Sequence, residues 1–139
     1  MKLVVDASVA LKWFLRGRPD ELHVAEAEAV LSVIGESRTE LFAPGHWIAE
    51  VIAVLARTKP GAVDDALIFL DDMRPVIVGG IPAVKRAAEL SIALDHHLFD
   101  TLYHAVALEE GATLVTADEV YFTKAKDLGG LQRLSDFRV

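Results

Sequence analysis

The 139-residue sequence contains no cysteine, which excludes disulfide bonds, thiolate zinc sites and a cysteine nucleophile. It also lacks the glycine-rich loop that cradles nucleotide phosphates and the glycine pattern that binds dinucleotides. Its apolar runs, such as Trp47–Ala56 and Thr101–Leu108, are too short to cross a bilayer and contain Glu50 and His104. We therefore expect no membrane span, and any bound metal should be held mainly by oxygen ligands.

Positive charge is scarce, because 14 Lys and Arg residues stand against 21 Asp and Glu residues and leave a net charge of −7. This balance argues against a broad, nonspecific surface for nucleic acid, and an acidic exterior suits a basic protein partner. The amino terminus runs into a predicted strand at Lys2 without a signal-like apolar segment, so we expect a cytoplasmic protein. A local basic track is still available from Lys12, Arg16, Arg18, Arg57 and Lys59.

Apolar runs alternate with helical periodicity along the chain, which predicts a single α/β domain over residues 1–139. With 53% hydrophobic residues, the chain is long enough to bury one continuous core, and no linker, repeat or low-complexity segment divides it. The predicted strands are Lys2–Val5, Leu41–Ala43, Val76–Val78, Thr113–Thr116 and Leu131–Leu134. The predicted helices are Val9–Leu15, Glu21–Ile34, His46–Arg57, Val63–Met73, Ala83–Leu94, Asp100–Glu109 and Val120–Lys126.

Four carboxylates lie beside or inside apolar segments, where an isolated charge is costly. Asp6 and Asp118 follow predicted strands, Asp100 opens a helix, and Glu50 lies one turn inside another helix. Ligands of an open parallel sheet gather beyond the carboxyl ends of its strands, so we expect Asp6 and Asp118 to face one crevice. Four converging anions would repel each other unless a divalent cation neutralised them.

Oxygen ligands of this kind favour Mg²⁺ or Mn²⁺, which keep bound waters and leave room for a substrate phosphate. The pattern therefore indicates an enzyme in which metal-activated water attacks a phosphate ester. We assign Asp6, Asp100 and Asp118 mainly to metal binding, and Glu50 to orienting water or holding a second metal. Any one of these candidate catalytic acids alone is more often a turn or capping residue, and Glu50 has an ion pair with Arg57 as its alternative.

Two hydroxyl residues accompany the aspartates at the strand ends. Ser8 and Thr116 each lie two residues from an aspartate, so their hydroxyls could orient the Asp6 and Asp118 carboxylates. The alternatives are that Ser8 caps the first helix and that Thr116 is only a strand-forming residue.

Three histidines lie near the third of these acids in the sequence. His104 shares a helical face with Asp100, a spacing that could recruit zinc, but a buried, hydrogen-bonded histidine is the interpretation we prefer. His96 and His97 stand at a helix end and are interpreted as helix-dipole partners or surface groups.

The four acids stand in motifs that, in order and spacing, resemble those of PIN-domain ribonucleases. The resemblance runs from Met1 nearly to Val139 and is greatest to the VapC-type toxins of toxin–antitoxin pairs. Two positions depart from the family pattern, since Ala53 stands where relatives often carry asparagine and Tyr121 where phenylalanine is common. The motifs are Val4-Val5-Asp6-Ala7-Ser8-Val9, Glu50-Val51, Asp100-Thr101-Leu102-Tyr103-His104-Ala105 and Leu114-Val115-Thr116-Ala117-Asp118.

The resemblance implies a three-layer α/β/α fold with a central parallel sheet, and four acids around Mg²⁺ or Mn²⁺. It further implies endoribonuclease activity on RNA, a cognate antitoxin that inhibits the enzyme, and a homodimer. Apolar side chains of two early helices are interpreted as core or subunit contacts, or as a groove for an antitoxin helix. These side chains are Trp13, Phe14, Leu15, Leu67, Phe69 and Leu70.

Three other functions share parts of this pattern. A catalytically silent PIN-like module that only binds RNA or an antitoxin would keep the same acids and stays open. A phosphoacceptor receiver domain needs an aspartate after the third strand, but Val76–Gly80 contains none. A haloacid-dehalogenase-type phosphatase needs a second aspartate two residues after Asp6, where Ser8 stands.

Overall fold

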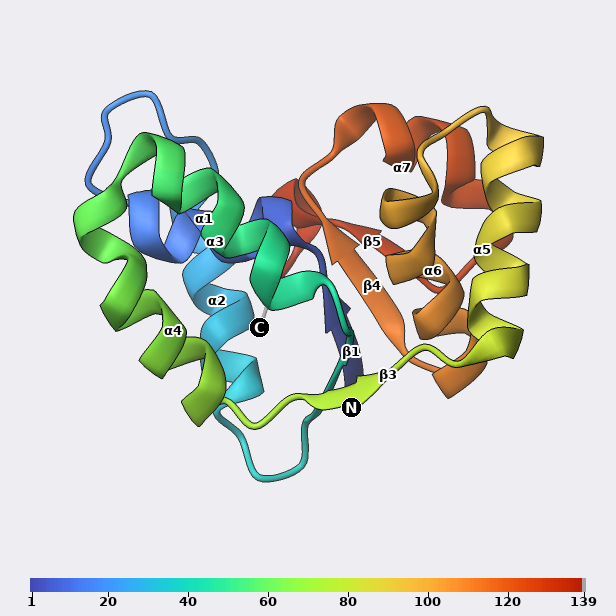
Figure 1. The fold of residues 1–139 in the computed structure, drawn as a ribbon, viewed down its shortest axis with the longest axis horizontal. Coiled ribbons are helices and arrows are strands. Elements are labelled where there is room, and N and C mark those ends of the chain that lie inside the picture. The colour runs from blue at the N-terminus through green and yellow to red at the C-terminus, as the bar shows by residue number, and fades with distance from the viewer. Residues whose placement is uncertain (139) are drawn as a thin grey trace.

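The computed structural model describes residues 1–138 as a five-stranded parallel sheet with helices on both faces (Figure 1). The strands are β1 (Lys2–Val5), β2 (Glu40–Pro44), β3 (Val76–Val78), β4 (Thr113–Thr116) and β5 (Leu131–Arg133). The α-helices are α1 (Ala7–Leu15), α2 (Val24–Ile34), α3 (Trp47–Thr58), α4 (Val63–Asp72), α5 (Ile81–Leu94), α6 (Leu98–Glu110) and α7 (Glu119–Ala125). Short 3-10 turns are η1 (Pro60–Ala62), η2 (Lys126–Leu128) and η3 (Leu134–Asp136).

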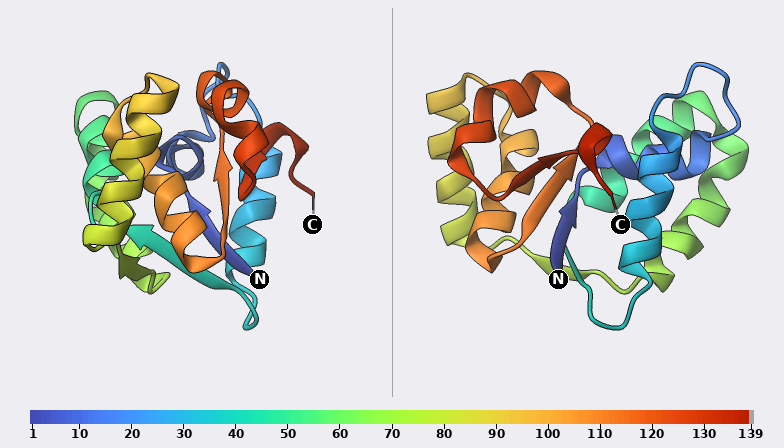
Figure 2. Two further views of the ribbon diagram at one scale, coloured as in Figure 1. Left: turned by 90° about the vertical axis from the view of Figure 1, so that its right-hand side faces the viewer. Right: turned by 180° about the vertical axis from the view of Figure 1, so that it is seen from behind.

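The predicted three-layer α/β/α architecture is confirmed. Helix α6 packs across β1, β2 and β4 and is itself covered by α5, while α1 packs against α2 and α3. Figure 2 shows α5 and α6 on one side of the sheet and α2 on the other. No helix within residues 1–138 is both long and apolar enough to span a bilayer.

The strand order is β3-β2-β1-β4-β5, so the side on which new strands are added changes at β1. From β1 the chain adds β2 and β3 on one side, then crosses over and adds β4 and β5 on the other. In such a sheet the ligand crevice lies at this switch point, beyond the carboxyl ends of the strands. Val5 pairs with Val115, and the next amide, of Asp6, donates to the Val115 carbonyl at 3.3 Å, so Asp6 stands directly in the crevice.

The central strands are apolar on both faces because helices cover both. Leu3, Val4, Val5, Leu114 and Val115 are all buried. The largest buried side chains outside the sheet are aromatic and belong to the helices that surround the crevice. They are Trp47 in α3, Tyr103 in α6 and Tyr121 in α7.

Every predicted strand and helix is present, and most ends differ from the prediction by no more than two residues. Helix α1 begins at Ala7 because the Asp6 side chain accepts a hydrogen bond from the Val9 amide and caps it. Helix α5 begins at Ile81 because Pro82 is well suited to a first helical turn. Helix α6 begins at Leu98, so Asp100 lies within its first turn instead of opening the helix.

The start of α2 is the largest difference, because this helix begins at Val24 and not at Glu21. The Glu21 carboxylate is 2.9 Å from Nζ of the buried Lys12, and the same Nζ donates to the Leu22 carbonyl at 2.6 Å. His23 then has a left-handed φ of 57°, which ends this irregular segment. Lys12 is therefore not part of the predicted basic track.

His104 joins α6 to α7 from inside the protein. Its Nε2 lies 2.8 Å from the Gly129 carbonyl, and its Nδ1 lies 2.8 Å from the Tyr121 hydroxyl. Since a carbonyl can only accept, Nε2 carries the proton and Nδ1 accepts from the tyrosine, which leaves a neutral ring. The prediction of a hydrogen-bonded histidine is confirmed.

We expect His104 to make the fold less stable below pH 6.5. Burial lowers its pKa in the fold, whereas the unfolded chain takes up a proton near pH 6.5. The unfolded state then binds more protons, so this part of the stability is present above the unfolded pKa and lost as pH falls. The loss is at most about 1.4 kcal/mol per pH unit.

Urea unfolding at pH 7.5 and pH 5.5 tests this expectation. His104→Gln should lose less stability than the wild type between the two values, because glutamine does not titrate. His97→Gln, which changes an exposed histidine, should follow the wild type. An equal pH dependence in all three proteins would contradict the assignment.

Candidate metal centre

Asp6 lies at the end of β1 and receives hydrogen bonds from two hydroxyls and one amide. Ser8 Oγ donates to Oδ1, Thr116 Oγ1 donates to Oδ2, and the Val9 amide donates to Oδ1 at 3.3 Å. Both carboxylate oxygens are therefore oriented by neighbouring donors. Oδ1 accepts two of these hydrogen bonds and Oδ2 only one, so Oδ2 keeps a lone pair that can bind a cation.

The same hydroxyls connect the ends of β1 and β4. Ser8 Oγ accepts from the Ala117 amide at 3.1 Å, and Thr116 Oγ1 accepts from the Asp118 amide at 3.0 Å. The predicted orienting contact is confirmed for Asp6, whereas the helix-cap interpretation of Ser8 is wrong because Asp6 is the cap. Thr116 contacts the backbone of Asp118 and not its carboxylate.

Burial raises the pKa of Asp6 to about 6, against the opposing effect of its three hydrogen bonds. The negative charge of Asp118 adds a smaller upward contribution to this pKa. The ionised carboxylate is thus unfavourable in the protein alone, and a cation beside it would offset this free-energy cost.

Asp100 and Asp118 form a second part of the cluster, together with His96. One ligand atom from each of these three residues lies within 4.8 Å of the other two. His96 Nε2 is 3.2 Å from Asp100 Oδ2 and 3.8 Å from Asp118 Oδ2. Asp118 also caps α7 by accepting from the Tyr121 amide at 3.0 Å.

The interpretation of His96 as a helix-dipole partner or surface group is wrong. Its side chain is only 10% exposed and faces the two aspartates. The four-residue interval between His96 and Asp100 could have suggested that the two side chains lie close together. The interval does not lie within one helix, however, because α6 starts only at Leu98, after His96.

Glu50 lies on α3 and is held by residues that sequence reasoning did not assign to the site. The Tyr103 hydroxyl donates to Glu50 Oε2 at 2.6 Å, and His46 Nε2 is 3.8 Å from Oε1. His46 Nε2 also lies 2.9 Å from the Phe99 carbonyl. The partners of Glu50 are therefore Tyr103 and His46, and not Arg57 as the alternative proposed.

Two buried tyrosines connect the four acids. Burial raises the pKa of Tyr103, and its bond to Glu50 and the charges of Glu50, Asp6 and Asp100 raise it further. Burial also raises the pKa of Tyr121, as do the charges of Asp100, Asp118 and Asp6. The charges of Asp6 and Asp100 thus act on both tyrosines, whereas Glu50 acts on Tyr103 and Asp118 on Tyr121.

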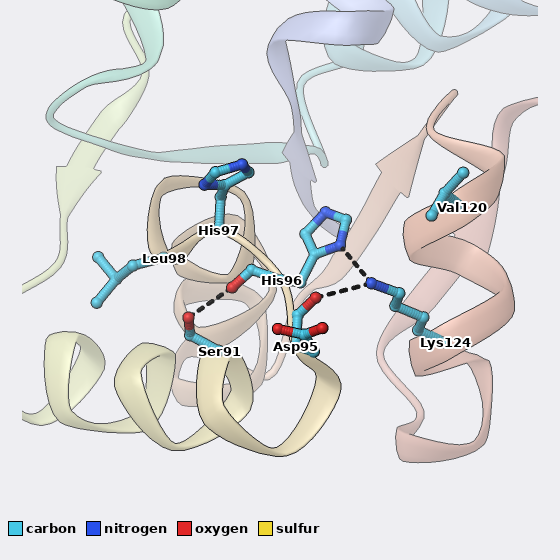
Figure 3. A pocket seen from close by; sticks show the side chains of 7 residues that line it. All are labelled: Ser91, Asp95, His96, His97, Leu98, Val120 and Lys124. Atoms are coloured by element: carbon cyan, nitrogen blue, oxygen red, sulfur yellow. Dashed lines mark hydrogen bonds between the residues drawn. The ribbon is translucent and has the colours of Figure 1, made fainter.

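A pocket of about 490 Å³ opens beside this cluster, on the outer side of His96 (Figure 3). Lys124 Nζ donates to the Asp95 carbonyl at 2.8 Å and lies 3.3 Å from His96 Nδ1. A cationic group therefore stands beside His96, where it can attract an anionic substrate. The pocket is lined by Ser91, Asp95, His96, His97, Leu98, Val120 and Lys124.

The donor set fits a divalent ion. Carboxylate oxygens are the preferred ligands of Mg²⁺ and Mn²⁺, and imidazole is accepted by Mn²⁺ and zinc. Within residues 1–138, the buried Nε2 of His96 has no hydrogen-bond partner, although it lies within 4 Å of two carboxylates. A cation among these atoms would satisfy both the excess negative charge and the unpaired nitrogen.

Solved structures share this fold at low sequence identity. VapBC2 from Rickettsia felis, bound to a promoter DNA fragment, matches with a TM-score of 0.71 and 15% identity, covering 96% of this chain and 98% of the other. VapBC-1 from nontypeable Haemophilus influenzae matches at 0.69 and 18%, covering 98% and 100%. VapC20 from Mycobacterium tuberculosis, described as a sarcin-ricin loop cleaving toxin, matches at 0.64 and 18%, covering 87% and 94%.

Sequence comparison identifies a family directly. No curated protein sequence matches the chain. The PIN domain family matches residues 3–128, which include all four predicted acids and every strand except β5. Since this match covers most of the sequence and the fold agrees with it, the chain belongs to the PIN domain family.

Proposed function

We propose that this protein is a VapC-type toxin that hydrolyses RNA phosphodiester bonds with the help of Mg²⁺ or Mn²⁺. The proposal is supported by Asp6 at the switch point of the sheet, by the Asp100 and Asp118 carboxylates near His96 Nε2, and by Glu50, whose charge acts on the same tyrosine as the charges of Asp6 and Asp100. Membership of the PIN domain family and the RNA-loop-cleaving activity in the description of VapC20 support RNA as the substrate class. Cytoplasmic RNA is the expected target.

In this proposal Asp6, Asp100 and Asp118 hold the ion. A divalent ion held there lowers the pKa of water and neutralises charge on the substrate phosphate. Glu50 orients the attacking water or holds a second ion, and the Tyr103 hydroxyl keeps the Glu50 carboxylate in position. Thr116 occupies one lone pair of Asp6 Oδ2 and leaves the other free for the ion, while Ser8 fixes the orientation of the carboxylate through Oδ1.

The proposed partners are a cognate antitoxin and a second copy of the chain. Three of the six apolar side chains considered for a groove, Trp13, Leu15 and Leu70, are buried in the core. Phe14 and the 40% exposed Phe69 remain accessible and line a hollow of about 210 Å³, which suits an apolar antitoxin side chain. Helix α5 exposes Ile81 and Ile92 at 82% and 83%, as a subunit interface would require.

We expect Asp6→Asn to lower RNA cleavage by about 100-fold or more, because it removes a charged metal ligand without changing size. The measurement maps RNA ends after incubating a mixed-sequence RNA pool with Mg²⁺ or Mn²⁺. The exposed Asp64→Asn is the matched control and should cut like the wild type. Equal cleavage by Asp6→Asn, or cleavage that survives chelation by EDTA, would contradict the proposal. RNA binding without cleavage by the wild type would favour the silent module.

A second prediction concerns stability without metal. The pKa of Asp6 is about 6 in the fold and near 3.8 when unperturbed, so the folded state binds the proton more tightly. Stability from this group is therefore lost as pH rises from about 4 to 6, and Asn, which does not ionise, escapes the loss. We therefore compare the melting temperatures of Asp6→Asn and the wild type in EDTA. The melting temperature of Asp6→Asn minus that of the wild type should be larger at pH 8 than at pH 4.5.

Adding Mn²⁺ at pH 8 should reverse this order, because only the wild type gains stability from the bound ion. Thermal unfolding of both proteins, with and without Mn²⁺, gives the comparison. A difference between the two melting temperatures that does not change with pH would show that the Asp6 charge is not destabilising.

A third prediction concerns the hydroxyls. Thr116→Val keeps the shape of the side chain but removes the donor to Asp6 Oδ2, so we expect Mn²⁺ to bind about 10–100-fold more weakly. Isothermal titration calorimetry measures the affinity. Thr123→Val, which removes an exposed hydroxyl bound to its own helix, is the control and should bind like the wild type. Wild-type affinity in Thr116→Val would rule out the orienting role.

A further inference from the structure

His96 presents a buried ring nitrogen to two carboxylates without forming a hydrogen bond. Its Nε2 has no partner among the described residues, and the side chain is 10% exposed. A buried polar atom without a partner loses its hydration without compensation, so native proteins rarely contain one without a reason. Asp100 Oδ2 and Asp118 Oδ2 lie 3.2 and 3.8 Å from this nitrogen.

We propose that Nε2 of His96 is a ligand of the divalent ion held by Asp100 and Asp118, which makes this a mixed nitrogen and oxygen centre. The inference rests on the metal site proposed above and adds a ligand to it. Ligands about 2.1 Å from one ion stand about 3 Å apart at right angles and about 4.2 Å apart across it. Both separations from His96 Nε2, 3.2 and 3.8 Å, lie in this range.

The imidazole is held in place from several sides, as a metal ligand requires. Its ring packs against Tyr121 with the ring centres 4.9 Å apart, and His104 fixes the Tyr121 hydroxyl. Its backbone is fixed by Ser91, whose carbonyl accepts from the His96 amide at 3.2 Å and whose hydroxyl donates to the His96 carbonyl. Asp95 has a left-handed φ of 50° and turns the chain toward the site.

The other ring nitrogen of His96, Nδ1, contacts Lys124, and this contact must change when an ion binds Nε2. Nδ1 lies 3.3 Å from Lys124 Nζ, and Figure 3 shows this contact on the side of the pocket. An ammonium group can only donate, so in this arrangement Nε2 carries the proton. Metal binding at Nε2 requires the proton on Nδ1, and Lys124 must then turn away from the ring.

Lys124 has room to turn. Its ammonium group can keep the hydrogen bond to the Asp95 carbonyl, 2.8 Å away. The 490 Å³ pocket admits water, which can then accept a hydrogen bond from His96 Nδ1. Lys124 and the ion therefore compete for His96. Replacing Lys124 by Gln, whose side-chain oxygen can accept from Nδ1, should strengthen metal binding, and this gain should require His96.

A nitrogen ligand changes which ion the site prefers. Magnesium strongly prefers oxygen, whereas manganese accepts imidazole more readily. A site with this histidine ligand would therefore prefer Mn²⁺ over Mg²⁺ more strongly than a site made of the four carboxylates alone.

The decisive test uses the full-length protein freed of metal with EDTA and then loaded with Mn²⁺ alone. Pulsed electron paramagnetic resonance detects ¹⁴N bound directly to Mn²⁺. The wild type and His97→Gln should show the nitrogen coupling, and His96→Gln should lose it. Competition with Mg²⁺ should show that His96→Gln loses about tenfold or more of the preference for Mn²⁺. The gain in Mn²⁺ affinity from Lys124→Gln should disappear in the double variant with His96→Gln.

Two outcomes would overturn this inference and remain distinguishable. Wild-type protein that binds Mn²⁺ without nitrogen coupling would exclude His96 as a ligand and leave the carboxylate site intact. Wild-type protein that binds no Mn²⁺ at millimolar concentration would overturn both the ligand and the proposed function. If His96→Gln does not fold, wild type labelled with ¹⁵N-histidine decides the question, because a true ligand must change the coupling from ¹⁴N to ¹⁵N.

Discussion

Negative charge at the carboxyl edge of β1 and β4 is the constraint around which this fold is arranged. Asp6 stands in the crevice where the strand order reverses, and three hydrogen bonds orient its carboxylate. These bonds do not cancel the effect of burial, since the pKa of Asp6 remains near 6. The neighbouring acids add to the repulsion. A cation beside these acids would offset the repulsion and would supply the proposed chemistry, which connects the electrostatics of the fold to the proposed function.

Buried aromatic side chains bring the other acids to this edge. All four acids lie on helices or helix caps, and three of them are three residues from an aromatic that is at most 2% exposed. Residues three apart share a helical face, so fixing the aromatic in the core also aims the acid. The three pairs are Trp47 with Glu50, Asp100 with Tyr103, and Asp118 with Tyr121. The departure at Tyr121 also has a physical role, because a phenylalanine there could not hydrogen-bond His104.

The sequence predicted the features that depend on local pattern. Strands β1, β3 and β4 agree with their predicted bounds because short runs of apolar and β-branched residues followed by turn residues indicate strands of a parallel sheet. The four acids were recognisable because charge at the ends of such runs is rare. What could not be predicted depends on contacts between distant segments. The Lys12–Glu21 ion pair shortens α2. The positions of His96 and His46 depend on packing between segments, which the pattern of apolar residues does not predict.

The central claim is that acids from separate segments hold one divalent centre at the switch point. Anomalous X-ray diffraction from crystals soaked in Mn²⁺ tests it most directly, because the signal locates the metal independently of the protein atoms. The account predicts a strong peak about 2.0–2.3 Å from carboxylate oxygens of Asp6, Asp100 and Asp118. Peaks confined to other surfaces, with these carboxylates still hydrogen-bonded only to protein groups, would contradict it.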